Sequence, residues 1–252
     1  MLDFRNFLPQ DFSNLQWLIM LLCAVLVGLN KTALPGVGII VVPLIASFFP
    51  ARLSTGLLLP MLALADLFAV GYYHRHANWK IILKLLPAAI VGIAAGSIVI
   101  RRIDDQSLRP VIGIIVLVML ALNCLREKYV KQDFSESKIF AGIMGFLAGL
   151  TTQLANAAGP VMTIYLLSMR LPKYEFIGTG AWYFLILNWL KMAIFASEGR
   201  ITVQTISADI AMLPLIAAGA FAGIYILKKV PQKWFNWVVQ ILAAAAAVKL
   251  LF

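Results

Sequence analysis

Two interrupted apolar regions decide the fold of this chain. The first is broken by Gly28-Leu-Asn-Lys-Thr-Ala-Leu-Pro-Gly-Val-Gly38, and the second by Gly149-Leu-Thr-Thr-Gln-Leu-Ala-Asn-Ala-Ala-Gly-Pro160. The apolar arms on either side of each break hold about a dozen residues or fewer, which is under roughly 20 Å of helix. Because a helix needs about 20 apolar residues to cross the hydrocarbon core, neither arm spans a membrane alone. We therefore predict a broken or re-entrant helix over 15–49 and another over 138–170.

The composition of the chain indicates that its main solvent is lipid. Of 252 residues, 62% are hydrophobic and only 13% are charged, whereas a soluble domain carries about 25% charge. The apolar runs are continuous rather than alternating, which favours helices over a β-barrel. The start of the chain lacks a signal-peptide pattern, so we expect the first segment to be retained. Further runs of spanning length bring the total to about eight helical segments of an all-α integral membrane protein; they lie near 53–73, 81–100, 108–125, 175–196, 205–227 and 232–251.

Internal similarity divides the chain into two homologous halves. Gly28-Leu29 matches Gly149-Leu150, and Pro87 with the glycines after it matches Pro214 with its own. Each half, 1–125 and 138–252, is expected to hold one broken helix and three transmembrane helices, with a charged linker at 126–137. If each broken region is a re-entrant hairpin, the halves are inverted repeats and more of the loop Lys and Arg share one face. The positive-inside tendency favours this arrangement over parallel halves and places both termini outside the cytoplasm.

The formal charge of +10 does not indicate a nucleic-acid partner. The basic residues lie in short clusters between apolar runs, where they flank helix ends and set orientation. No zinc-protease, nucleophile-elbow or phosphate-loop motif is present, which argues against an enzyme. We expect no catalytic residue, no cofactor and no metal site.

The two breaks are the predicted substrate site. Paired breaks at corresponding positions of repeated halves are typical of transporter sites, because unwound backbone is tolerated in a membrane only where it lines a cavity or is buried. Half-helix N-termini with free N–H groups suit an anion. The alternative is a loop that only kinks a long helix. The predicted substrate-binding residues are Asn30, Lys31, Thr32, Gly36, Gly38, Thr152, Gln153, Asn156 and Gly159.

Three polar residues within the spans are candidates for coupling or gating: Asp66, Asn188 and Lys191. A carboxylate as deep as Asp66 is costly enough to need a partner or a role. It could carry a coupling proton, or it could form a structural pair with Lys31 or Lys191. Both lysines have the alternative of snorkelling to the interface.

The two break motifs resemble those of the TauE/SafE sulfite exporter family. The similarity covers nearly the whole length and includes the connectors Phe49-Pro-Ala-Arg-Leu-Ser-Thr-Gly56 and Met169-Arg-Leu-Pro-Lys173. This resemblance implies a permease of the bacterial inner membrane that exports sulfite, sulfoacetate or a related anion. Many members are richer in glycine at the first break, where this chain has Asn30-Lys31-Thr32, so its substrate could differ.

Together these observations predict a multi-pass secondary transporter that exports a small anion, sulfite or a related organosulfur anion, driven by protons or by the membrane potential. The alternatives are an anion channel, which would show no counterflow, and a carrier for a small carboxylate. The expected partners are the anionic substrate and the lipid bilayer. A homodimer is left open.

Overall fold

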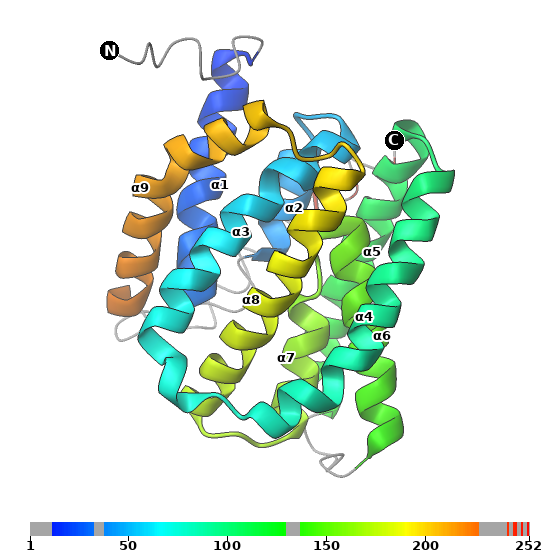
Figure 1. The fold of residues 1–252 in the computed structure, drawn as a ribbon, viewed down its shortest axis with the longest axis vertical. Helices are drawn as coiled ribbons and strands as arrows, with labels where there is room; N and C mark the ends of the chain where they lie inside the picture. The colour runs from blue at the N-terminus through cyan, green and yellow to red at the C-terminus, as the bar shows by residue number, and fades with distance from the viewer. Residues whose placement is uncertain are drawn as a thin grey trace.

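The computed structural model describes residues 12–32, 38–129 and 137–226, together with Ile241, Ala244, Ala245, Val248 and Leu251 near the C-terminus. Within these residues the chain is helical and has no strand (Figure 1), which confirms the predicted all-α class. The predicted last span, 232–251, lies almost entirely outside the described residues. The elements are α1 (Asn14–Thr32), α2 (Gly38–Ala46), α3 (Ala51–Tyr73), the 3-10 turn η2 (His74–His76), α4 (Trp79–Arg102), α5 (Asp105–Tyr129), α6 (Lys138–Ala155), α7 (Gly159–Ser168), α8 (Lys173–Ser197) and α9 (Val203–Ile226).

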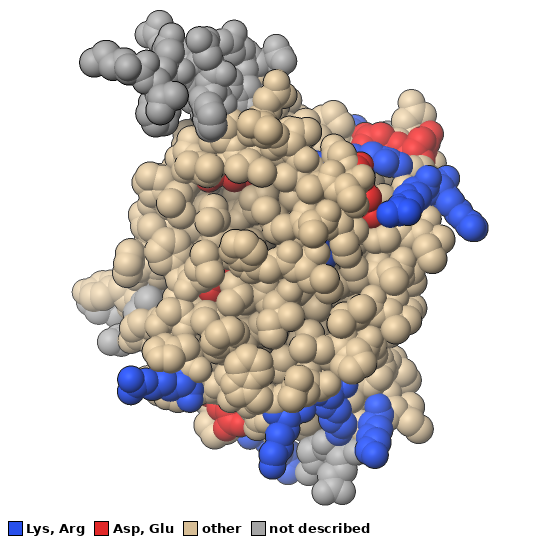
Figure 2. Space-filling view, viewed as in Figure 1, with Lys and Arg blue, Asp and Glu red and all other residues tan. Residues whose placement is uncertain are grey.

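Seven of these described helices are long and apolar enough to cross a membrane: α1, α3, α4, α5, α6, α8 and α9. On the face drawn in Figure 2, most Lys and Arg side chains lie towards the two ends of the molecule, and the broad middle is almost free of charge. An uncharged belt between charged ends is what a bilayer requires of a protein that spans it. The chain is thus a multi-pass membrane protein.

The region 15–49 forms a hairpin that enters and leaves at the same end of the bundle (Figure 1). Gln16 at the start of α1 donates from Nε2 to the carbonyl of Phe48 after α2, at 3.0 Å. The rings of Phe12 and Phe49 also meet, with centroids 5.1 Å apart. The prediction that neither arm spans a membrane alone is wrong for α1 and for α6, which hold 19 and 18 residues and are long enough to cross. It holds for α2, which has only nine residues and returns the chain to the end at which α1 begins.

The region 138–170 forms a second hairpin, which enters from the opposite end (Figure 1). Phe140 in the first turn of α6 stacks on Tyr165 near the end of α7, with ring centroids 5.6 Å apart. The short connector after α7 then leads into α8 at that same end. The two hairpins therefore point towards each other, as an inverted arrangement requires; that the two halves are homologous stays a prediction.

The first helix of each hairpin packs along a helix from the other half of the chain: α1 packs along α9, and α6 packs along α4. Glycines allow both contacts. A Cβ on Gly28 would lie 2.2 Å from the carbonyl oxygen of Ile216, and a Cβ on Gly149 would lie 2.0 Å from that of Ala89. These glycines thus bring the backbones of the two helix pairs into direct contact.

A carboxylate from α5 caps α3. Asp105 accepts from the backbone N–H groups of Ala51 and Arg52 at 2.9 and 2.7 Å, where the positive end of the α3 dipole lies.

Asp105→Asn is expected to lower the free energy of unfolding by about 1 kcal/mol, measured by thermal unfolding in detergent. The nearby exposed Gln106→Ala serves as the control. Equal stability of the two variants would contradict the capping role.

Candidate substrate-binding site

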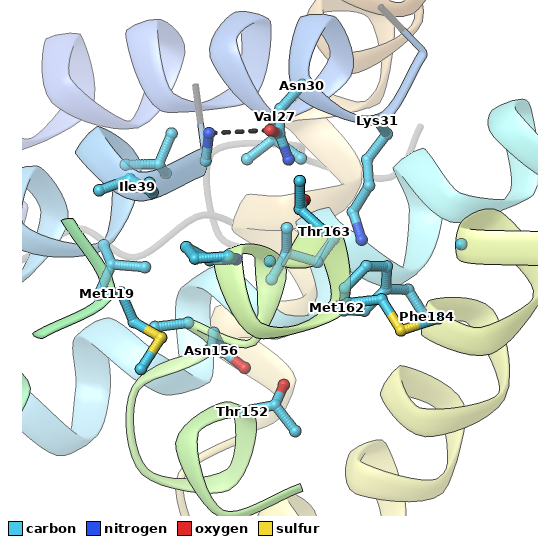
Figure 3. A pocket seen from close by; sticks show the side chains of 18 of the residues that line it. Val27, Asn30, Lys31, Ile39, Met119, Thr152, Asn156, Met162, Thr163 and Phe184 are labelled. Carbon is cyan, nitrogen blue, oxygen red and sulfur yellow. Dashed lines mark hydrogen bonds between the residues drawn. The ribbon is translucent and has the colours of Figure 1, made fainter. Parts of the chain in front are cut away.

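A cavity of about 120 Å³ lies where the ends of the two hairpins meet (Figure 3). Since a water molecule occupies about 30 Å³ in the liquid, this space suits a small ion. Most of the wall is apolar and comes from α2, α3, α5, α7 and α8. Its polar side chains are those of Asn30, Lys31, Thr152, Asn156, Thr163 and Asn188.

In the first hairpin, Asn30 joins the two helices. Its Oδ1 accepts from the backbone N–H of Gly38 at 2.9 Å, so the last turn of α1 is tied to the first residue of α2 (Figure 3). A Cβ on Gly38 would come within 2.8 Å of the Asn30 side-chain nitrogen, which explains the glycine. Both residues line the cavity. The predicted site residue Gly36 lies outside the described residues.

In the second hairpin, Asn156 ends α6. Its backbone is left-handed, with φ 53° and ψ 29°, and its N–H donates to the carbonyl groups of Thr151 and Thr152. Its side chain donates from Nδ2 to the carbonyl of Thr55 at 3.0 Å. Asparagine is one of the few side chains that adopt this conformation readily. The turn directs the chain into α7, whose first residue, Gly159, also lines the cavity.

The structure pairs Asp66 with Lys31. Asp66 is fully buried in α3, and its Oδ1 lies 2.7 Å from the Nζ of Lys31. Its Oδ2 accepts from the Nδ2 of Asn188 in α8 at 2.6 Å. The Lys31 ammonium also lies 4.4 Å from the centre of the Phe184 ring. Lys31 therefore does not snorkel to the interface: its side chain lines the cavity (Figure 3) and pairs with the buried Asp66.

Lys191 does not snorkel either, because its side chain is fully buried and turned inward. Its Nζ donates to the carbonyl and the hydroxyl of Thr152, at 3.0 and 2.8 Å, and to Oδ1 of Asn156 at 2.7 Å. Both acceptor residues line the cavity. Lys191 thus lies directly behind the wall that the second hairpin provides.

Two predicted binding residues, Thr32 and Gln153, do not line the cavity, because other helices use their side chains. The Thr32 hydroxyl donates to the carbonyl of Ala220 in α9 at 2.8 Å. The Gln153 amide donates to the hydroxyl of Ser97 at 2.8 Å. Both side chains join helices that lie far apart in the sequence.

The sequence interpretation missed a buried ion pair between α8 and α9. Arg200 is 2% exposed and donates to Glu198, to the hydroxyl of Thr55 at 3.2 Å and to the carbonyl of Gln153 at 3.3 Å. Burial lowers the pKa of Arg200 to about 10, and the adjacent Glu198 opposes that shift, so the guanidinium stays charged at neutral pH. The sequence Glu-Gly-Arg between two apolar runs is typical of an exposed loop and carries no signal of this role.

The same interpretation passed over Asp209 in α9. Its carboxyl group is fully buried, and within the described residues neither of its oxygens has a hydrogen-bond partner. Thr163, which contributes a hydroxyl to the cavity wall, was also missed. A single acidic or hydroxyl side chain in an apolar run gives no indication of which neighbour it will face.

Comparison with known proteins assigns the family. No curated protein and no solved structure matches the chain at a significant level. One family model matches, and it covers residues 20–250, which include most of the first hairpin, all of the second and every residue that lines the cavity. The chain therefore belongs to the sulfite exporter TauE/SafE family of membrane transporters.

Proposed function

We propose that this chain is a secondary carrier that exports a small anion, sulfite or a related organosulfur anion, across a bacterial inner membrane, driven by protons or by the membrane potential. The observation that carries the proposal is the charge around the cavity. Among the described residues that line it or bond to its lining side chains, Lys31 and Lys191 are cationic and only Asp66 is anionic. A cavity with one surplus positive charge suits an anion.

The two half-helices support the same proposal. Gly38 begins α2 and Gly159 begins α7, and both residues line the cavity. The first turn of a helix carries the positive end of its dipole. Because the Gly38 N–H already donates to Asn30 and Pro160 has no N–H, the support comes from the two dipole ends. Discontinuous helices that meet near the middle of a bundle are the usual site of substrate binding in carriers built this way.

A layer of buried polar contacts favours a carrier over an open channel. Asn156 bonds to the carbonyl of Thr55, and Arg200 bonds to the Thr55 hydroxyl. Thr55 lies in the first turns of α3, between the cavity and the end of the bundle at which α3 begins. Transport past this layer would require these bonds to open, as alternating access does.

The test is uptake of labelled sulfite by proteoliposomes under an imposed pH gradient. The expected result is saturable, gradient-sensitive flux with counterflow, reduced at least about tenfold in Asn156→Ala because a bond to a buried ammonium is lost. Gln204→Ala, which removes an exposed amide from α9, is the matched control and should keep the flux.

Other outcomes separate the alternatives. Flux without saturation or counterflow would indicate an anion channel. No flux above that of empty liposomes would remove sulfite as the substrate, and a panel containing sulfoacetate and small carboxylates would follow.

A further inference from the structure

The charged groups around the cavity fall into two sets with different partners. Asp66 uses one carboxylate oxygen for Lys31 and the other for Asn188. Among the residues that the structure describes, Lys191 has only neutral acceptors: two oxygens of Thr152 and one of Asn156. One lysine is therefore paired with a carboxylate, and the other is not.

The contacts of Lys191 can accommodate a charged ammonium. An ammonium has three N–H donors and no acceptor, and three oxygens lie within 3.0 Å of this Nζ. Among the described residues, no acidic side chain forms an ion pair or a hydrogen bond with Lys191. Glu198 binds Arg200, and neither oxygen of Asp209 bonds to any described residue.

A fully buried ammonium without an anion is costly at membrane depth. The cavity offers the place for that anion, since Thr152 and Asn156 each contact Lys191 on one side and the cavity on the other. An anion bound against these two side chains would be separated from the Lys191 ammonium by a single layer of side chains, those of Thr152 and Asn156. Asp66 pairs with Lys31 and Asn188, and among the described residues no hydrogen bond or ion pair joins it to Lys191.

We infer that Lys191 is the fixed counter-charge of the transported anion, and that the site is matched to an anion with a single negative charge. This inference rests on the proposed anion transport and narrows its substrate class. Lys31, Asp66 and Lys191 together leave one positive charge, which a monoanion neutralises. A dianion would leave one buried negative charge in excess.

The consequence for substrate choice is specific. A monosulfonate and the singly protonated form of sulfite each carry one negative charge and therefore match the site. Sulfoacetate, which has a sulfonate and a carboxylate, carries two charges at neutral pH, and so it should bind less tightly than a monosulfonate of similar size.

The experiment measures binding of methanesulfonate and of sulfoacetate to the purified full-length protein by calorimetry, with counterflow competition as the second readout. The wild type is expected to prefer methanesulfonate. Lys191→Met should weaken methanesulfonate binding at least about tenfold, because a buried countercharge is lost. Lys191→Gln, which keeps a hydrogen-bonding side chain, should behave alike and serves if the methionine variant does not fold.

Three further variants test the charge count itself. Asp66→Asn raises the surplus to two positive charges and should shift the preference towards sulfoacetate. Asp66→Asn combined with Lys191→Met returns the surplus to one and should restore the preference for methanesulfonate. Lys191→Arg, which keeps the charge, should retain monoanion binding better than Lys191→Gln.

Two results would overturn the inference while leaving anion transport standing: unchanged methanesulfonate binding in both Lys191→Met and Lys191→Gln, or a wild type that prefers the dianion. If the folded wild type bound neither anion and showed no anion flux, the proposed function would fall, and the inference with it.

Discussion

Lys31→Met is expected to destabilise the protein by about 3–5 kcal/mol, the usual cost of removing one partner of a buried ion pair. The variant leaves the Asp66 carboxylate fully buried, with Asn188 as its remaining partner among the described residues. Thermal and denaturant unfolding in detergent micelles measures the effect. Lys80→Met, which removes an exposed lysine from the first turn of α4, is the control and should change stability little.

A second substitution tests the cause of that loss. In Lys31→Met combined with Asp66→Asn, no unpaired carboxylate remains, so most of the lost stability should return. If the double variant were as unstable as Lys31→Met alone, the loss would come from the packing of the Lys31 side chain, for example on Phe184, and not from the ion pair.

Gly149→Ala is expected to cost more than about 3 kcal/mol or to prevent folding, because the added methyl group meets backbone and not a flexible side chain. Its Cβ would lie 2.0 Å from the carbonyl oxygen of Ala89, so α6 and α4 would have to separate. The yield of monodisperse protein and its thermal midpoint measure the effect.

The same helix provides the control. A Cβ on Gly142 meets nothing within 4 Å, so Gly142→Ala should be neutral or should stabilise α6 by up to about 1 kcal/mol through its better helix propensity. Equal stability of Gly142→Ala and Gly149→Ala would show that α4 and α6 do not approach each other as described.

Much of the fold could be predicted because lipid restricts what a segment can do. The polar, helix-breaking residues in the middle of 15–49 and 138–170 left only a kink or a re-entrant hairpin, and these breaks mark where the cavity forms. The lengths of the arms were predicted less well, because α1 and α6 extend through residues that were assigned to the breaks. Asn30, Lys31, Thr152 and Asn156 lie at the breaks in the sequence and line the cavity in the structure. Their role in binding stays a prediction.

The partners of the buried charges could not be predicted. Asp66 had two candidate lysines, and the choice of Lys31 depends on how α1 and α3 are rotated against each other. The bond from Asn188 to Asp66 joins residues 122 positions apart, and hydropathy carries no information on such pairs. For the same reason the burial of Arg200 and Glu198, which lie in the connector between α8 and α9, could not be predicted.

The packing of α1 against α9 constrains the order in which the protein can assemble during synthesis. The Thr32 hydroxyl at the end of α1 bonds to a carbonyl of α9 that lies 188 residues later, and most of the chain must be synthesised before that surface is covered. Until then, Gly28 and its neighbours face lipid or another protein. At about 5–20 residues per second, this wait lasts on the order of ten seconds or more. α1 must therefore remain in the membrane as a partly polar helix that does not yet contact α9. Assembly can be completed only after translation of the second hairpin and α9.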